Sequence, residues 1–112
     1  MAVRAFRMNL NPGQAEEYRK RHDEIWPDLV DALRDAGVSD YRIYLDPDTL
    51  ALFAVLTHDD EHRLDQLPAL DVMQRWWRHM QSIMASHPDA SPVSVELLPM
   101  FTLQARPGVE RG

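Results

Sequence analysis

The chain has 112 residues, of which 45% are hydrophobic and 27% are charged, a profile typical of one globular domain that excludes a disordered chain. Its formal charge of −6, with 18 acidic against 12 basic side chains and no block of Lys or Arg, argues against nucleic acid as a partner. Because cysteine is absent, the sequence excludes disulfides, thiolate metal ligands and a cysteine nucleophile, and we expect a reducing compartment, the cytoplasm. Residues 1–7 are interrupted by charge, so we expect neither a signal peptide nor a membrane span there.

The first third of the chain is predicted to form a strand and a long, interrupted helix. Alternation of side chains over residues 3–10 indicates the strand. Residues 11–14, Asn-Pro-Gly-Gln, are typical of a helix start, and apolar side chains at three- and four-residue steps continue to about Ala36. Pro27 lies deep within this helix, so we expect a kink or a short break near residues 22–26.

The rest of the chain is predicted to form a hairpin, a second helix and a last strand. Two strands joined by a turn-rich tetrad are expected to pair antiparallel, over residues 41–45 and 50–56. A second helical region runs from about residue 59 to residue 85 and is interrupted at Pro68. Residues 93–103 form a last extended stretch, in which Pro99 argues for an edge position or a bulge.

The order strand, helix, strand, strand, helix, strand is the split βαβ pattern of ferredoxin-like folds, so we assign the chain to the α+β class as a βαββαβ domain. We expect one domain over residues 1–104 and a flexible C-terminal tail over residues 105–112. In this fold both helices cover one face of the sheet and leave the other face free. Pairing of two such faces buries apolar side chains, and a homodimer is therefore expected.

Tyr18 and His22 are the first candidates for chemistry, because they lie four residues apart and share one helical face. A phenol and an imidazole can both donate and accept hydrogen bonds, and histidine changes charge near neutral pH without help from its surroundings. Ile25 and Leu29 continue the same stripe, which points His22 inward. The alternative is that His22 lies on a charged helix surface without a catalytic role.

Trp76 and Trp77 are the second feature. Adjacent helical positions diverge by about 100°, so the two indoles are expected in different environments, one in the core and the other at a pocket. An indole face packs well against the C–H face of a sugar, and its N–H can bind a hydroxyl, so the pair suits carbohydrate binding. Packing in the core or in a dimer is the alternative.

Tyr41 and Tyr44 should point to opposite faces of their strand, and each is a candidate for ligand contact. The alternation does not say which of the two faces the helices.

Metal and phosphate sites have little support in the sequence. His58 and His62 enclose an acidic run that could hold a metal loosely, but its carboxylates are better explained as the first turn of a helix. The sequence has no glycine-rich phosphate loop and no Gly-x-Ser-x-Gly elbow. We therefore expect no metal site.

Four blocks of the sequence resemble the L-rhamnose mutarotase family in order and spacing, and together they span nearly the whole chain: residues 21–29, 41–46, 74–77 and 91–94. The resemblance implies a dimeric ferredoxin-like α+β barrel, in which a histidine donates a proton and aromatic residues hold the pyranose ring. It implies a catalytic role for His22 and sugar binding by Tyr18, Tyr41, Trp76 and Trp77. The substrate would be L-rhamnose or a related 6-deoxyhexose, and no cofactor would be needed.

Exchange of anomers requires that the anomeric hydroxyl lose a proton while the ring oxygen gains one, followed by C1–C2 rotation and reclosure. One positioned acid or base typically contributes about 10²–10⁴-fold to such a reaction. We expect His22 to protonate the ring oxygen directly or through a water, and Tyr18 or a water to handle the anomeric hydroxyl. Two other classes stay open: a dimeric α+β barrel monooxygenase that binds a flat apolar substrate or haem, and a non-catalytic barrel in which these side chains only pack.

Overall fold

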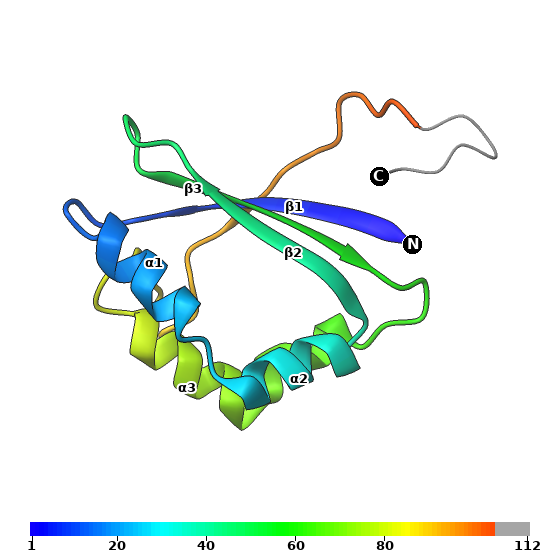
Figure 1. Ribbon diagram of the computed structural model, residues 1–112, viewed down its shortest axis with the longest axis horizontal. Helices are drawn as coiled ribbons and strands as arrows, with labels where there is room; N and C mark the ends of the chain where they lie inside the picture. The colour runs from blue at the N-terminus through cyan, green and yellow to red at the C-terminus, as the bar shows by residue number, and fades with distance from the viewer. Residues whose placement is uncertain (105–112) are drawn as a thin grey trace.

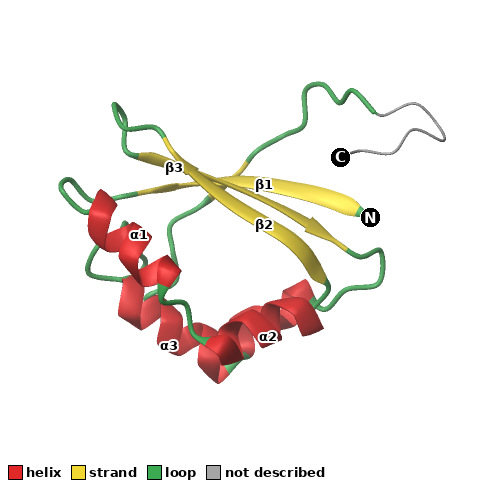
Figure 2. Cartoon of the chain, in the orientation of Figure 1, coloured by secondary structure: helices red, strands yellow, loops and turns green. Residues whose placement is uncertain are grey.

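The computed structural model describes residues 1–104, and its helical and strand regions follow one another along the chain in the expected order (Figure 2). In chain order the elements are β1 (Ala2–Asn9), α1 (Ala15–Asp23), α2 (Pro27–Asp35), β2 (Val38–Leu45), β3 (Ala51–His58), the 3-10 helix η1 (Leu64–Ala69), α3 (Asp71–Met80) and β4 (Val95–Glu96). The predicted tail over residues 105–112 lies outside the described residues. Within the described part, none of the helices is long and apolar enough to cross a membrane.

The four strands form one antiparallel sheet in the order β2-β3-β1-β4. This order and the element sequence confirm the predicted ferredoxin-like α+β fold. The helices cover one face of the sheet, and the other face has no covering layer among the described residues (Figure 1). In the register of the sheet, Met8 lies opposite Leu52 and Tyr41 lies opposite Leu56. These four side chains are on the same face of the sheet, the one that the helices cover. β2 is an edge strand, which leaves one side of it free to border a cavity.

The predicted break in the first helical region is confirmed. α1 ends at Asp23 and α2 begins at Pro27, where a proline at the first helical position loses no intrahelical bond. Trp26, just before the proline, has φ −68° and ψ 133°, the extended conformation that a following proline favours. Its carbonyl oxygen accepts hydrogen bonds from the N–H groups of Leu29 and Val30, at 3.1 Å each, which fixes its backbone at the start of α2.

Two predicted elements are shorter than expected. α3 ends at Met80 and does not reach Ala85, because the N–H of Ala85 donates to the carbonyl oxygen of Asn9, at 2.9 Å, and so continues the pairing of β1. The last strand was expected over residues 93–103, but β4 spans only Val95 and Glu96, and the N–H of Leu97 adds one further bond to β1, to the carbonyl oxygen of Ala5 at 2.9 Å. Pro99 has no N–H to donate, and the chain from residue 98 to residue 104 is exposed and leaves the sheet.

The main core lies between the sheet and the helices. Leu29 of α2 and Leu52 of β3 are the largest fully buried side chains in the described residues. They are surrounded by further apolar groups from β1, α3 and the turn after α3, with Met8, Met80, Ile83 and Met84 among them. The core therefore lies on the face of the sheet that the helices cover, where the two layers meet.

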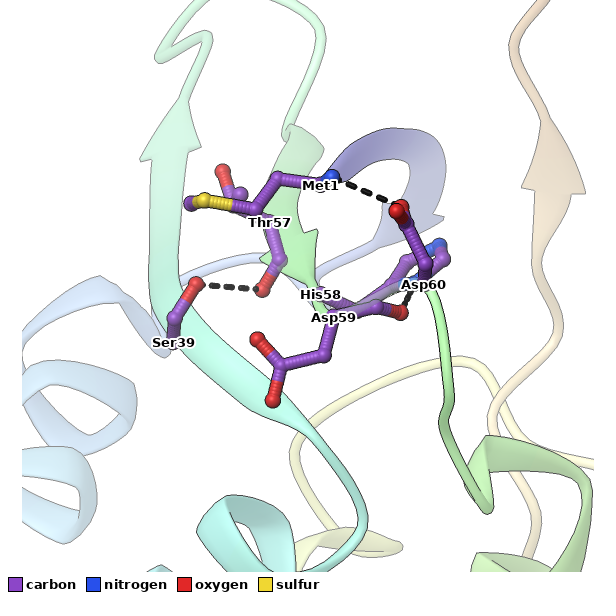
Figure 3. A network of polar contacts seen from close by, with 6 residues as sticks. All are labelled: Met1, Ser39, Thr57, His58, Asp59 and Asp60. Atoms are coloured by element: carbon purple, nitrogen blue, oxygen red, sulfur yellow. Dashed lines mark hydrogen bonds and ion pairs between the residues drawn. The ribbon is translucent and has the colours of Figure 1, made fainter.

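Polar contacts join neighbouring segments at the end of the sheet where β2 begins and β3 ends (Figure 3). The N-terminal ammonium group of Met1 lies 2.7 Å from a carboxylate oxygen of Asp60, and Ser39 Oγ donates to the carbonyl oxygen of Thr57 at 3.3 Å. The register of β2 against β3 shifts between Val38 and Asp40, so Ser39 forms a bulge. Both partners of the Met1–Asp60 pair are exposed, and the pair adds little to stability.

Candidate active site

An open cavity of about 960 Å³ lies between the sheet and the helix layer. Its walls come from α1, α2, β2 and α3, and its floor comes from β1 and β3. All five residues singled out from the sequence line this one cavity: Tyr18, His22, Tyr41, Trp76 and Trp77. The structure thus brings together side chains that lie up to 59 positions apart in the sequence.

α1 supplies the imidazole and one phenol. The rings of Tyr18 and His22 have centroids 4.4 Å apart and are tilted by 31°. Nδ1 of His22 lies 3.0 Å from the backbone oxygen of Tyr18, and because a carbonyl can only accept, Nδ1 must carry the proton. Nε2 is therefore the nitrogen available to a ligand.

Burial lowers the pKa of His22, although the hydrogen bond to the Tyr18 carbonyl and the negative charge of Asp23 oppose the shift. His22 therefore gives up a bound proton more readily than a solvated histidine does. A group of this kind can act on protons near neutral pH.

The two phenols border the same cavity from opposite layers. Tyr41 faces the helices together with Ile43 and Leu45, whereas Tyr44 is 57% exposed on the other face of β2. Tyr41 is 38% exposed as a whole residue, yet burial of its phenol raises the pKa to about 12. Burial, together with the neighbouring Tyr41, also raises the pKa of Tyr18. Both phenols therefore stay protonated at neutral pH and act as uncharged hydrogen-bonding groups.

Both tryptophans of α3 border the cavity, although their helical positions diverge. Trp76 is only 8% exposed, packs in the core and meets His22 edge to face, with ring centroids 5.4 Å apart and an interplanar angle of 86°. Trp77 is half-buried and lines the cavity as well. The expected division is confirmed in that Trp76 lies in the core and Trp77 at the cavity, but Trp76 borders the cavity as well. The cavity is wide enough for two adjacent positions on one helix to reach it.

Sequence reasoning missed two groups of residues near this site. Trp26, at the break between α1 and α2, packs edge to face on Trp76 with centroids 5.2 Å apart. Pro27 marks the break at which Trp26 lies, but no signal in the sequence places its indole against Trp76. Arg19 and Asp40 also line the cavity, but neither belongs to a pattern that would separate it from ordinary surface charge.

Metal-binding groups are not gathered at the cavity. Across residues 1–104, no cluster of three or more His, Cys, Asp or Glu side chains could hold a metal ion. The rings of His58 and His62, the pair considered from the sequence, lie 4.4 Å apart outside the cavity. The arrangement at the cavity itself provides an acid–base group, two uncharged phenols and an aromatic wall.

Known proteins resemble the chain over nearly its whole length. A family model described as L-rhamnose mutarotase matches residues 4–103. An L-rhamnose mutarotase from Paraburkholderia phytofirmans is 55% identical over 105 residues, which cover 94% of this chain and 98% of the relative. Another from Brucella anthropi is 60% identical over 97 residues, or 87% of this chain and 92% of the relative. The crystal structure of an L-rhamnose mutarotase from Formosa agariphila has a TM-score of 0.86 at 38% identity, and covers 93% of this chain and all of that chain.

Proposed function

The chain belongs to the L-rhamnose mutarotase family, and from this premise we infer that it interconverts the α and β anomers of L-rhamnose. The observation that carries this function is the match of the family model to residues 4–103, a range that contains every residue lining the cavity. This membership decides among the three classes that the sequence left open. The reaction needs only proton transfers, ring opening and reclosure, which the groups in the cavity can supply.

His22 is the proposed proton donor to the ring oxygen. With the proton on Nδ1 engaged by the Tyr18 carbonyl, Nε2 donates when the ring is an imidazolium and accepts when it is neutral. In ring opening the imidazolium gives the Nε2 proton to the ring oxygen while the anomeric hydroxyl loses its own proton. After rotation about C1–C2, the hydroxyl formed from the ring oxygen returns its proton to Nε2 as the ring closes, and the aldehyde oxygen takes up a proton to become the anomeric hydroxyl. His22 is therefore regenerated in each cycle.

The two phenols are proposed to hold the sugar hydroxyls. Tyr18 and Tyr41 remain neutral, because burial raises the pKa of each, so they bind hydroxyls without adding charge to the site. A buried neutral phenol is a poor proton acceptor. We therefore expect a water to take the anomeric proton, with Tyr18 as its hydrogen-bonding partner or as a relay.

The two indoles are proposed to form the wall against which the pyranose packs. Trp76 and Trp77 present aromatic surface to the cavity, and apolar side chains of β2 and α3, such as Ile43 and Met73, continue it. An aromatic and aliphatic wall accommodates the C–H face and the C6 methyl group of a 6-deoxyhexose.

Polarimetry on freshly dissolved α-L-rhamnose tests the activity directly. The optical rotation drifts to its equilibrium value without a catalyst, so the expected result is a first-order rate that increases in proportion to protein concentration. Heat-denatured protein is the control. A rate that does not depend on native protein would contradict the proposed function.

A homodimer is proposed to form through the sheet face that the helices leave open. Val3 and Tyr44 are 66% and 57% exposed on this side, and Phe53 and Val55 of β3 point the same way because they alternate with buried neighbours. Light scattering should give twice the mass of the chain. Val55→Lys should give the mass of one chain, and a wild-type monomer would contradict the proposal.

We propose a cytoplasmic location as well, which accords with a sequence that has no cysteine. Cell fractionation that places the protein outside the cytoplasm would contradict this proposal.

A further inference from the structure

Trp26 lies outside the cavity, but it contacts a residue of the cavity wall. Trp76 meets two rings at right angles, His22 at 5.4 Å and 86° and Trp26 at 5.2 Å and 87°. Trp26 is not among the residues that line the cavity. The three rings form a chain of contacts that runs from the α1–α2 break through α3 to the proposed catalytic histidine.

The backbone of Trp26 is held more firmly than a loop residue usually is. Its conformation is restricted by Pro27, and its carbonyl oxygen accepts the first two hydrogen bonds of α2. The indole then contacts α3 through three side chains: Trp76, His79, at 5.5 Å with a tilt of 35°, and the guanidinium of Arg75, at 5.5 Å from the ring centre. Trp26 thus couples the position where α2 starts to the face of α3 that carries Trp76.

We propose that Trp26 is a positioning residue, which holds the indole of Trp76 against the imidazole of His22 and so sets the direction of Nε2. This inference rests on the proposed function of the cavity. The Nδ1–carbonyl contact fixes one end of the imidazole, but rotation about that contact would still move Nε2. The edge-to-face contact with Trp76 restricts that rotation, and Trp26 keeps Trp76 from turning away.

The test compares the kinetics of anomer exchange for four proteins: the wild type, Trp26→Leu, Trp26→Phe and the control Leu64→Ala. Leu64 is buried in a second core cluster and does not itself line the cavity, so its variant controls for loss of stability. Circular dichroism at the assay temperature confirms that each variant is folded. We expect Trp26→Leu to lower kcat about 10- to 100-fold, because a displaced catalytic group costs rate, while KM changes less than about twofold.

Trp26→Phe keeps an aromatic edge against Trp76, and we expect it to recover most of the lost kcat. A second readout is the pKa of the His22 imidazole, followed by NMR. In Trp26→Leu, access of water to His22 should raise this pKa, whereas Leu64→Ala should leave it unchanged. Tyr18 and Asp23 act directly on the imidazole, and Glu16, Arg19, Asp40 and Tyr41 line the same cavity. Neither variant substitutes any of these groups.

The outcomes separate this inference from the proposed function. If the wild type does not exchange anomers, the proposed function fails. If the wild type is active and folded Trp26→Leu keeps its kcat, loses no more than Leu64→Ala does, or shows only a raised KM, then Trp26 is a packing residue and the inference is overturned.

Discussion

Nδ1 of His22 lies 3.0 Å from the backbone oxygen of Tyr18, one turn earlier on α1. This contact fixes the tautomer of the imidazole, because a carbonyl oxygen cannot donate. The same helical spacing places the phenol of Tyr18 beside the imidazole, with the ring centroids 4.4 Å apart. Donation by Nε2 therefore requires a second proton on the ring, and this requirement has a measurable consequence.

The pH dependence of kcat should show that consequence. Burial lowers the pKa of His22 from the ordinary value for histidine, so the imidazolium predominates only at a pH below this lowered pKa. Because the proposed donor is the imidazolium, kcat should fall as the pH rises through this lowered pKa. The measurement is kcat for anomer exchange from acid to slightly alkaline pH, corrected for the uncatalysed rate. A kcat that rises over the same range would instead make neutral His22 the base in ring opening.

Tyr41 and Tyr44 provide a matched pair that tests which face of β2 meets the sugar. Tyr41→Phe removes a hydroxyl from the cavity, and loss of one hydrogen bond should raise KM about 2- to 10-fold. Tyr44→Phe removes a hydroxyl from the opposite face and should leave both kcat and KM near the wild-type values. Equal effects of the two substitutions, measured under the same conditions, would show that the sugar does not contact Tyr41.

Gly37 and Gly13 provide a second matched pair, for stability. Both have positive φ, 109° and 78°, so alanine at either position should cost about 1–3 kcal/mol of backbone strain. A Cβ at Gly37 would also lie 3.0 Å from the Cβ of His62, whereas a Cβ at Gly13 would have no atom within 4 Å. Urea unfolding should therefore show a larger loss of unfolding free energy for Gly37→Ala. A smaller or equal loss would mean that the segment carrying His62 moves aside without cost.

Local signals predicted much of the fold. Pro27 predicted the break between α1 and α2, because proline at that depth removes a hydrogen bond whatever the tertiary context. The end of α3 at Met80 could not be predicted in this way, since it depends on pairing of Ala85 with Asn9, 76 positions away. The length of β4 likewise depends on which residues of β1 it can pair with. Pro99 indicated only that the strand would be irregular.

The residues of the candidate site could be predicted from the sequence, but their arrangement in space could not. Helical spacing placed Tyr18 beside His22, and alternation separated Tyr41 from Tyr44, but only the structure shows that Tyr41 faces the helices. The place of Trp26 behind Trp76 was not predictable, because it depends on how α2 crosses α3. Periodicity within one element says little about the packing of one element on another.

The most direct test of the central claim is NMR magnetisation exchange between the α and β anomeric protons of L-rhamnose, with the wild type and with His22→Ala. The wild type should accelerate the exchange well above the uncatalysed rate. His22→Ala should lose about 10²–10⁴-fold of that acceleration while it keeps the wild-type circular dichroism spectrum. A wild type that does not accelerate the exchange would contradict mutarotase activity, and a folded His22→Ala variant with full activity would contradict the role of His22.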